Sequence, residues 1–230
     1  MQSPYMAKSM TSATPMTAAM EMYNWLHNIL KKNQRKSKSG SLKANLESFF
    51  RNVDPSFKDK VLSQVGYMAQ QAILSEGKAS QQVASSQDKW GYENKKKLVI
   101  SLFYGCLEQL LLQEESKSSN DEFLSVLNNE SFYRSLIACS IEIVFFVLNV
   151  SNIKFERLLE ICKIQAFEFW RIINSFIGFD AHMPFPIKRH LFDIEQRILR
   201  TLAWKKDSLV HQIIKTCITD SLEELSLIHI

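Results

Sequence analysis

The chain has 230 residues, of which 46% are hydrophobic and 11% aromatic, and it carries a formal net charge of +4. These values are typical of a globular protein with one large or two small domains, and they exclude a chain that is disordered throughout. The mild positive charge does not predict nucleic-acid binding, which requires a concentrated basic face. Glycine and proline number only 6 and 5. Because turn-rich β folds need more of both, the composition favours an all-α fold.

The N-terminal part of the chain predicts a disordered tail and then an amphipathic helix. Residues 1–13 are rich in Met, Ser and Thr. Thr14-Pro15 joins a good N-cap to a residue suited to the first helical position, and apolar residues follow at helical spacing as far as Leu30. The basic run 31–40 predicts a solvated loop and is a weak match to a nuclear localisation signal.

Three further helices are expected before the middle of the chain. Ser41 marks the start of a short one, and Asp54-Pro55 repeats the cap-and-proline signal for a longer one. The Ser- and Gln-rich residues 75–88 predict a surface loop. The long helix that follows has an apolar face made of Leu98, Val99, Leu102, Phe103, Cys106, Leu107 and Leu110.

The segment 132–148 is hydrophobic on almost every side. A helix of this kind must be enclosed by other helices, so we predict that it forms the buried centre of the domain. It contains Glu142 and is barely long enough to span a membrane, which favours a core helix. Shorter helices are predicted around it at 123–127, 155–162, 167–177 and 187–202, and a weaker helical pattern covers 207–225.

The chain shows no sequence motif for catalysis, phosphate binding or a cofactor. Its histidines are not paired at the i,i+4 spacing of a helical metal site, and His190 is interpreted as a structural residue. The four cysteines form no C-x-x-C pair, which predicts buried, reduced thiols in an intracellular protein: Cys106, Cys139, Cys162 and Cys217. The N-terminus lacks the apolar core of a signal peptide. We therefore expect a binding module without cofactor or metal, and an enzyme of helical fold is the disfavoured alternative.

Several segments resemble the A box of the retinoblastoma family of pocket proteins. The similarity is patchy before residue 95 and dense from 127 to 204. It is carried by Thr14-Pro15, Leu102-Phe103-Tyr104, 127–132 (LNNESF), 135–144 (SLIACSIEIV), 166–169 (AFEF), 175–177 (SFI), 189–191 (RHL) and 202–204 (LAW). The resemblance implies a cyclin-like helical domain over residues 14–216, built around one buried helix.

The same resemblance implies a function. Pocket proteins are nuclear corepressors that regulate the cell cycle by binding the transactivation segment of E-two-F type transcription factors in a groove between the A and B boxes. Positions of this groove match basic Arg171, Arg189 and Lys117, acidic Glu195, and apolar Phe132, Val126, Ile173 and Ile177. Cationic rim groups and apolar slots suit an acidic peptide with hydrophobic anchors. The plainer alternatives are solvated helix charges for the arginines and ordinary core residues for the apolar four.

The chain also departs from the family pattern. Gly178 and Ser125 stand where the family usually has basic residues, which weakens the electrostatic part of the site. The likeness ends near residue 216, so we expect a fragment that lacks the B box, and the tail 217–230 matches nothing familiar. A B box from the same or another chain is then an implied partner. Another cyclin-fold protein, such as a kinase-activating cyclin or a general transcription factor, is the alternative function.

Thr14-Pro15 also fits a site for proline-directed kinases, and the resemblance implies cyclin-dependent kinases as modifiers. A phosphate at a helix N-terminus is favoured by the exposed N–H groups and the helix dipole. The alternative is a plain N-cap followed by proline. No direct contact with nucleic acid or membrane is expected.

Overall fold

The computed structural model describes residues 14–38, 41–79, 86–117, 119–205 and 208–217, and over these ranges the chain is helical without a strand. The tail predicted for 1–13, and all but the first residue of the tail predicted for 217–230, lie outside the described residues. The main helices are α1 (Pro15–Lys38), α2 (Ser41–Phe49), α3 (Pro55–Ala79), α4 (Ser86–Lys117), α5 (Asn120–Leu127), α6 (Glu130–Val147), α7 (Phe155–Cys162), α8 (Ala166–Gly178) and α9 (Phe185–Arg200). Short 3-10 turns, η2 (Phe50–Asn52) and η3 (Leu202–Trp204), follow α2 and α9, and residues 209–217 are again helical. The predicted all-α class is confirmed.

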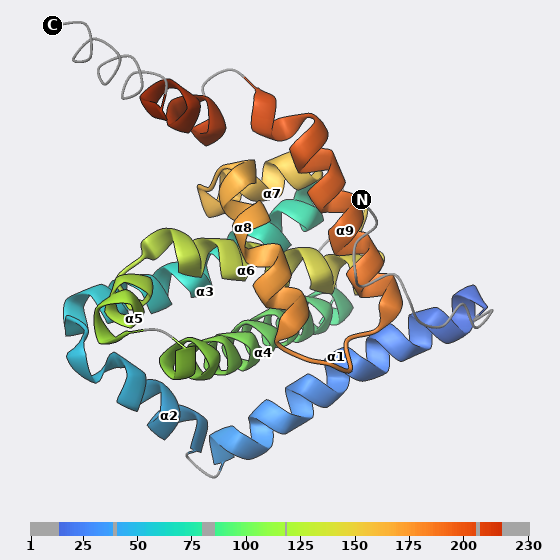
Figure 1. Cartoon of the computed structure of the whole chain (residues 1–230). Helices are drawn as coiled ribbons and strands as arrows, with labels where there is room; N and C mark the ends of the chain where they lie inside the picture. The colour runs from blue at the N-terminus through green and yellow to red at the C-terminus, as the bar shows by residue number, and fades with distance from the viewer. Residues whose placement is uncertain (1–13, 39–40, 80–85, 118, 206–207, 218–230) are drawn as a thin grey trace, which may run out of the picture.

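Helix α6 is the centre of the domain, as the sequence predicts. It packs against α1, α3, α4, α7, α8 and α9, which surround it in Figure 1. Two of its buried hydroxyl groups are hydrogen-bonded to nearby carbonyls: Ser140 donates to Leu136 at 2.9 Å, and Tyr133 donates to Leu127 at 2.8 Å. A helix enclosed in this way can carry polar residues only where they are hydrogen-bonded. None of the described helices has the length and apolarity needed to cross a membrane.

The loop predicted for the basic run 31–40 is wrong, because α1 continues without a break to Lys38. Its last two turns pack on α4. The Asn33 side chain is buried and donates to the Ser101 carbonyl at 2.6 Å, and a Cβ on Gly105 would lie only 2.8 Å from the Asn33 amide nitrogen. Lys36 forms an ion pair with Glu108 of α4. One face of a basic run therefore packs against a neighbouring helix while the other stays in solvent.

The loop predicted for 75–88 is also too long. Helix α3 runs to Ala79 and α4 begins at Ser86, so only residues 80–85 separate them, and those lie outside the described part of the chain. An ion pair between Lys95 of α4 and Glu76 of α3, with Nζ 2.7 Å from Oε2, ties the two ends together. Polar residues that pair across helices can extend a helix where composition alone suggests a loop.

Three of the four cysteines are buried as expected, but Cys217 is exposed on the helix 209–217. Burial raises the pKa of the Cys162 thiol to about 12, and it raises the pKa of Cys106 and Cys139 as well. Those three thiols are therefore protonated and unreactive at neutral pH. Cys217 differs because its helix turns most of its residues to solvent. Among the described residues, no group of His, Cys, Asp and Glu is arranged to hold a metal ion.

Candidate partner-binding groove

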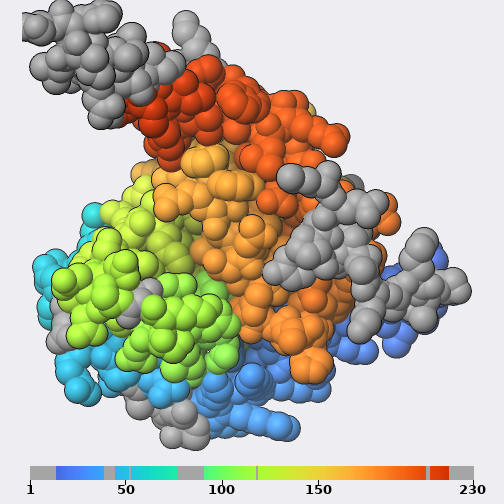
Figure 2. All heavy atoms as spheres, viewed as in Figure 1, coloured from blue at the N-terminus to red at the C-terminus, as the bar shows by residue number. Residues whose placement is uncertain are grey.

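A groove of about 230 Å³ lies where α4, the α5–α6 region and α8 meet. Its lining includes three of the residues singled out in the sequence, Val126, Phe132 and Arg171, together with Glu114 and Glu168. In Figure 2 the atoms of α8 (orange) lie beside those of α4 and α5 (green) on the face turned to the viewer. The groove is therefore open to a partner, with α6 beneath it and a different helix on each side.

The three predicted residues in the groove differ in exposure in a way that suits binding. Phe132 and Val126 are half-buried, so each presents part of an apolar side chain to the groove. Arg171 is exposed on α8 and extends from the opposite side. An apolar surface next to a solvated guanidinium can receive a hydrophobic anchor and a carboxylate at the same time.

The other predicted residues do not line this groove. Ile173 is fully buried in the core, since it lies two residues beyond Arg171 and so points to the inner side of α8. Ile172 lines the groove instead. Ile177 is half-buried and packs against the core. Of these two neighbours, Ile172 and not Ile173 therefore lines the groove.

The predicted charged residues on α4 and α9 lie outside the groove lining. Lys117 is exposed at the end of α4, and Arg189 is exposed on α9. Glu195 accepts a hydrogen bond from the indole nitrogen of Trp170 at 3.0 Å, which joins α9 to α8. One carboxylate oxygen of Glu195 therefore already has a donor within the protein.

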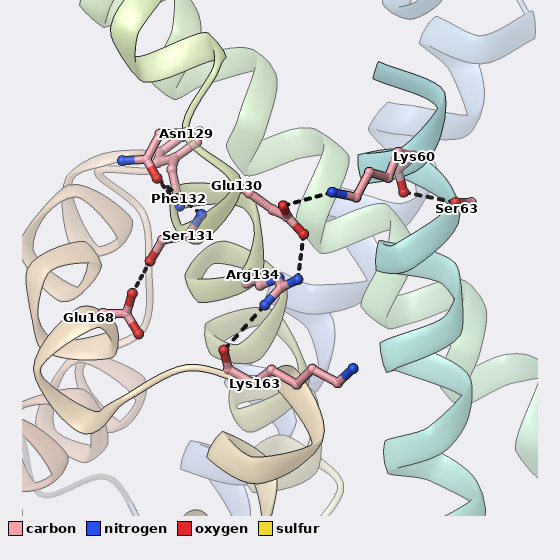
Figure 3. A network of polar contacts seen from close by, with 9 residues as sticks. All are labelled: Lys60, Ser63, Asn129, Glu130, Ser131, Phe132, Arg134, Lys163 and Glu168. Atoms are coloured by element: carbon pink, nitrogen blue, oxygen red, sulfur yellow. Dashed lines mark hydrogen bonds and ion pairs between the residues drawn. The ribbon is translucent and has the colours of Figure 1, made fainter. Parts of the chain in front are cut away.

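The floor of the groove is held by the N-terminus of α6. The Asn129 side chain caps this helix by accepting from the backbone N–H groups of Ser131 (3.0 Å) and Phe132 (3.3 Å). The Ser131 hydroxyl donates to Glu168, whose other oxygen accepts from the backbone N–H of Gln165 at 2.7 Å (Figure 3). Of these two bonds, Figure 3 draws the one between Ser131 and Glu168. The side chain of Glu168 thus caps α8 and connects it to α6. These groove residues were missed in the sequence, although Gln165 and Glu168 have the spacing of a capping box.

A second polar cluster anchors the same end of α6 on its other side. Figure 3 shows Glu130 between Lys60 of α3, 3.2 Å away, and Arg134, which also donates to the Lys163 carbonyl at 3.4 Å. Partial burial raises the pKa of the Glu130 carboxyl, but hydrogen bonds from Lys60 and Arg134 outweigh it and lower the pKa overall. The ion pairs therefore stabilise the fold above the carboxyl's ordinary pKa, and this contribution is lost as the pH falls through the lowered value.

A polar contact joins helix α9 to α6 within an apolar interface. The His190 Nε2 atom lies 2.9 Å from Glu142 Oε1, and the imidazole stacks on Phe146 with ring centroids 3.9 Å apart. The structural role expected for His190 agrees with this geometry.

Comparison with known proteins identifies the domain. The family model of the retinoblastoma-associated protein A domain matches residues 14–214, which include every helix that lines the groove. The chain belongs to the retinoblastoma-associated protein A domain family. The family resemblance expected from the sequence is confirmed, and so is the cyclin-like helical fold that this family has.

Three curated proteins similar to this A domain come from plants. The chain is 29% identical over 218 residues to retinoblastoma-related protein 1 of Nicotiana benthamiana, which covers 91% of this chain and 21% of that protein. It is 28% identical over 213 residues to retinoblastoma-related protein 1 of Oryza sativa subsp. indica, with 90% and 20% covered. For retinoblastoma-related protein 3 of Zea mays the identity is 28% over 208 residues, with 88% and 20% covered. The chain spans about one fifth of the length of these relatives.

Proposed function

We propose that this A domain is a non-enzymatic interaction module of a nuclear corepressor that regulates the cell cycle. It binds the transactivation segment of an E-two-F type transcription factor. Membership of the A-domain family supports the class of protein. The observation that carries the proposal is the meeting of Val126, Phe132 and Arg171, from three different helices, in one groove. The family match also favours this function over that of a kinase-activating cyclin or a general transcription factor.

The ligand binds in the groove and extends past it. Val126 and Phe132 receive an apolar anchor, and Arg171 pairs with an acidic side chain beside that anchor. Arg189, Lys117 and Glu195 lie outside the groove lining and contact the ligand beyond it. A B box, from the same or another chain, completes the site on the open side.

Changing Arg171 to glutamate is expected to weaken binding of an acidic, anchor-bearing peptide about tenfold, equivalent to ~1.4 kcal/mol. The reason is that one attraction is lost and one repulsion is gained. Fluorescence anisotropy of a labelled peptide, titrated with the chain in the presence of a B box, measures the Kd.

Arg51→Glu is the matched control, because Arg51 is exposed on η2 and outside the groove and its change alters the net charge equally. We expect a Kd close to that of the unchanged chain for this control. An Arg171→Glu chain that binds as tightly as the Arg51→Glu chain contradicts the groove assignment.

Thr14 is proposed as the site at which a cyclin-dependent kinase modifies the domain. It is exposed directly before α1, and its hydroxyl accepts from the backbone N–H of Thr17 at 3.3 Å. Incubation with the kinase and ATP is expected to add one phosphate to Thr14, located by mass spectrometry of the digested protein, and Thr14→Ala should remove it. An unmodified Thr14 after exhaustive incubation rejects this role.

A further inference from the structure

Ser135 of α6 lines the groove and is buried, and its hydroxyl has no hydrogen-bond partner among the described residues. We propose that this hydroxyl bonds a polar atom at the tip of the ligand's anchor, so that the groove selects an aromatic anchor that carries a hydrogen-bonding group. This inference rests on the proposed function and adds to it the chemistry of the anchor.

Ser135 is an exception among the buried polar residues. In the described part of the chain, five polar or charged residues are buried: Asn33, Ser101, Glu108, Ser135 and Ser140. All of them except Ser135 have a hydrogen-bond partner within the protein. Buried polar groups are almost always hydrogen-bonded, because leaving one unpaired costs free energy. The free hydroxyl of Ser135 therefore calls for a partner from outside the domain.

The Ser135 oxygen can be reached from the groove. Within the described residues, two buried side-chain atoms are fully enclosed without a partner, Nδ1 of His27 and Nε of Arg134. The Ser135 oxygen is not one of them, so it keeps contact with the groove although only 3% of the residue is exposed. A serine within a helix often donates to the carbonyl four residues earlier, as Ser140 does to Leu136. Ser135 makes no such bond, which leaves its hydroxyl available to a ligand.

Apolar side chains lie around this hydroxyl in the groove lining. Phe132 precedes Ser135 by three residues, so the two share one face of α6. Leu110 of α4 and Ile172 of α8 are buried residues of the same lining. An anchor that reaches Ser135 displaces solvent from the hydroxyl. A hydrocarbon tip then leaves it unpaired, whereas a tip with an N–H or O–H group restores the bond.

The shape and composition of the groove favour an aromatic ring as the anchor. The volume of about 230 Å³ is large enough for a ring, and the half-buried ring of Phe132 offers an aromatic contact. Tryptophan combines a large apolar body with one N–H donor, and a serine hydroxyl can accept from it. A naphthyl ring has a similar size and shape and lacks this donor. The two rings therefore test the hydrogen bond separately from the apolar contact.

The experiment uses two labelled acidic peptides that differ only at the anchor, which is tryptophan in one and naphthylalanine in the other. Anisotropy titrations with the full chain, in the presence of a B box, give the ratio of the naphthylalanine Kd to the tryptophan Kd. Ser135→Ala is expected to lower this ratio about fivefold, because it removes one hydrogen bond that only tryptophan can make. Comparing ratios between chains cancels the greater hydrophobicity of the naphthyl ring.

Ser140→Ala is the matched control. Ser140 is buried on the same helix, but its hydroxyl donates to Leu136 and it is not part of the groove lining. It should leave the ratio unchanged. An equal ratio in the unchanged chain and the Ser135→Ala chain overturns the role of Ser135 and leaves the groove itself in place. Failure of both peptides to bind the unchanged chain overturns the proposed function, and the inference with it.

Discussion

Replacing Phe169 with alanine is expected to lower the free energy of unfolding by about 3–5 kcal/mol, because a fully buried aromatic ring is removed and a cavity is left behind. Phe169 lies on the inner side of α8 with no exposed surface. Its ring meets Phe155 of α7 edge-on, with centroids 5.0 Å apart and an interplanar angle of 85°. Chemical denaturation followed by circular dichroism measures the loss.

The control for this change is available two residues away on the same helix. Phe167 is only half-buried and stacks on Trp170, with centroids 5.0 Å apart. Phe167→Ala should cost about 1 kcal/mol, because solvent already reaches the ring and little cavity forms. An equal loss of stability in the two variants would contradict the placement of Phe169 in the core. Because α8 also carries Arg171, the Phe169 variant tests whether the groove depends on this packing.

Replacing Lys36 with methionine is expected to lower the free energy of unfolding by about 3 kcal/mol. Its partner Glu108 has only 1% of its side chain exposed, and one of the two carboxylate oxygens accepts from Asn45 Nδ2 at 2.8 Å. Without the ammonium group, the negative charge of Glu108 stays buried beside the Asn45 amide, with no cation from α1 to balance it. Denaturant titration at neutral pH measures the change.

Two further variants separate this effect from a general loss of a surface lysine. The double variant Lys36→Met with Glu108→Leu is expected to recover most of the stability, because no charge is left buried. Lys60→Met is the exposed counterpart: Lys60 is 57% exposed and pairs with Glu130 at 3.2 Å, so its loss should cost less than 1 kcal/mol. A double variant as unstable as the single one would show that the lysine stem, and not the charge, supports α1.

The elements that the sequence predicts well are those with a strong local signal. Helix α6 is apolar on all sides, and a helix of this kind is stable only when other helices enclose it. The starts of α1 and α3 are marked by Thr14-Pro15 and Asp54-Pro55, and the Asp54 carboxylate accepts from the backbone N–H of Ser56 at 2.9 Å. Capping is a contact between residues two or three apart, so it can be read without knowledge of the fold.

The elements predicted poorly depend on contacts between distant residues. The run 31–38 is helical because Asn33 and Lys36 find Ser101 and Glu108, some 70 residues away on α4. Nothing within the run itself indicates these partners. The basic composition of the run correctly predicts the side that faces solvent. It does not predict the side that packs on α4.

The lining of the groove is predicted only in part, because its residues also come from distant parts of the sequence. Family likeness pointed to Val126, Phe132 and Arg171, and these do come together. It also pointed to Ile173, which faces inward, because a shift of one position on a helix turns a side chain by about 100°. The relative placement of Arg171 and Arg189 depends on how α8 and α9 cross, which periodicity within each helix does not contain.

The contact between His190 and Glu142 has a consequence for how the domain meets a partner. It holds α9 against α6, and the hydrogen bond from Trp170 to Glu195 holds α9 against α8. Because these two hydrogen bonds lie on different sides of α9, they oppose rotation of the helix about its long axis. A partner that contacts α9 would therefore meet a helix that is already ordered, and it would lose less free energy to ordering that helix than to ordering a loosely held one.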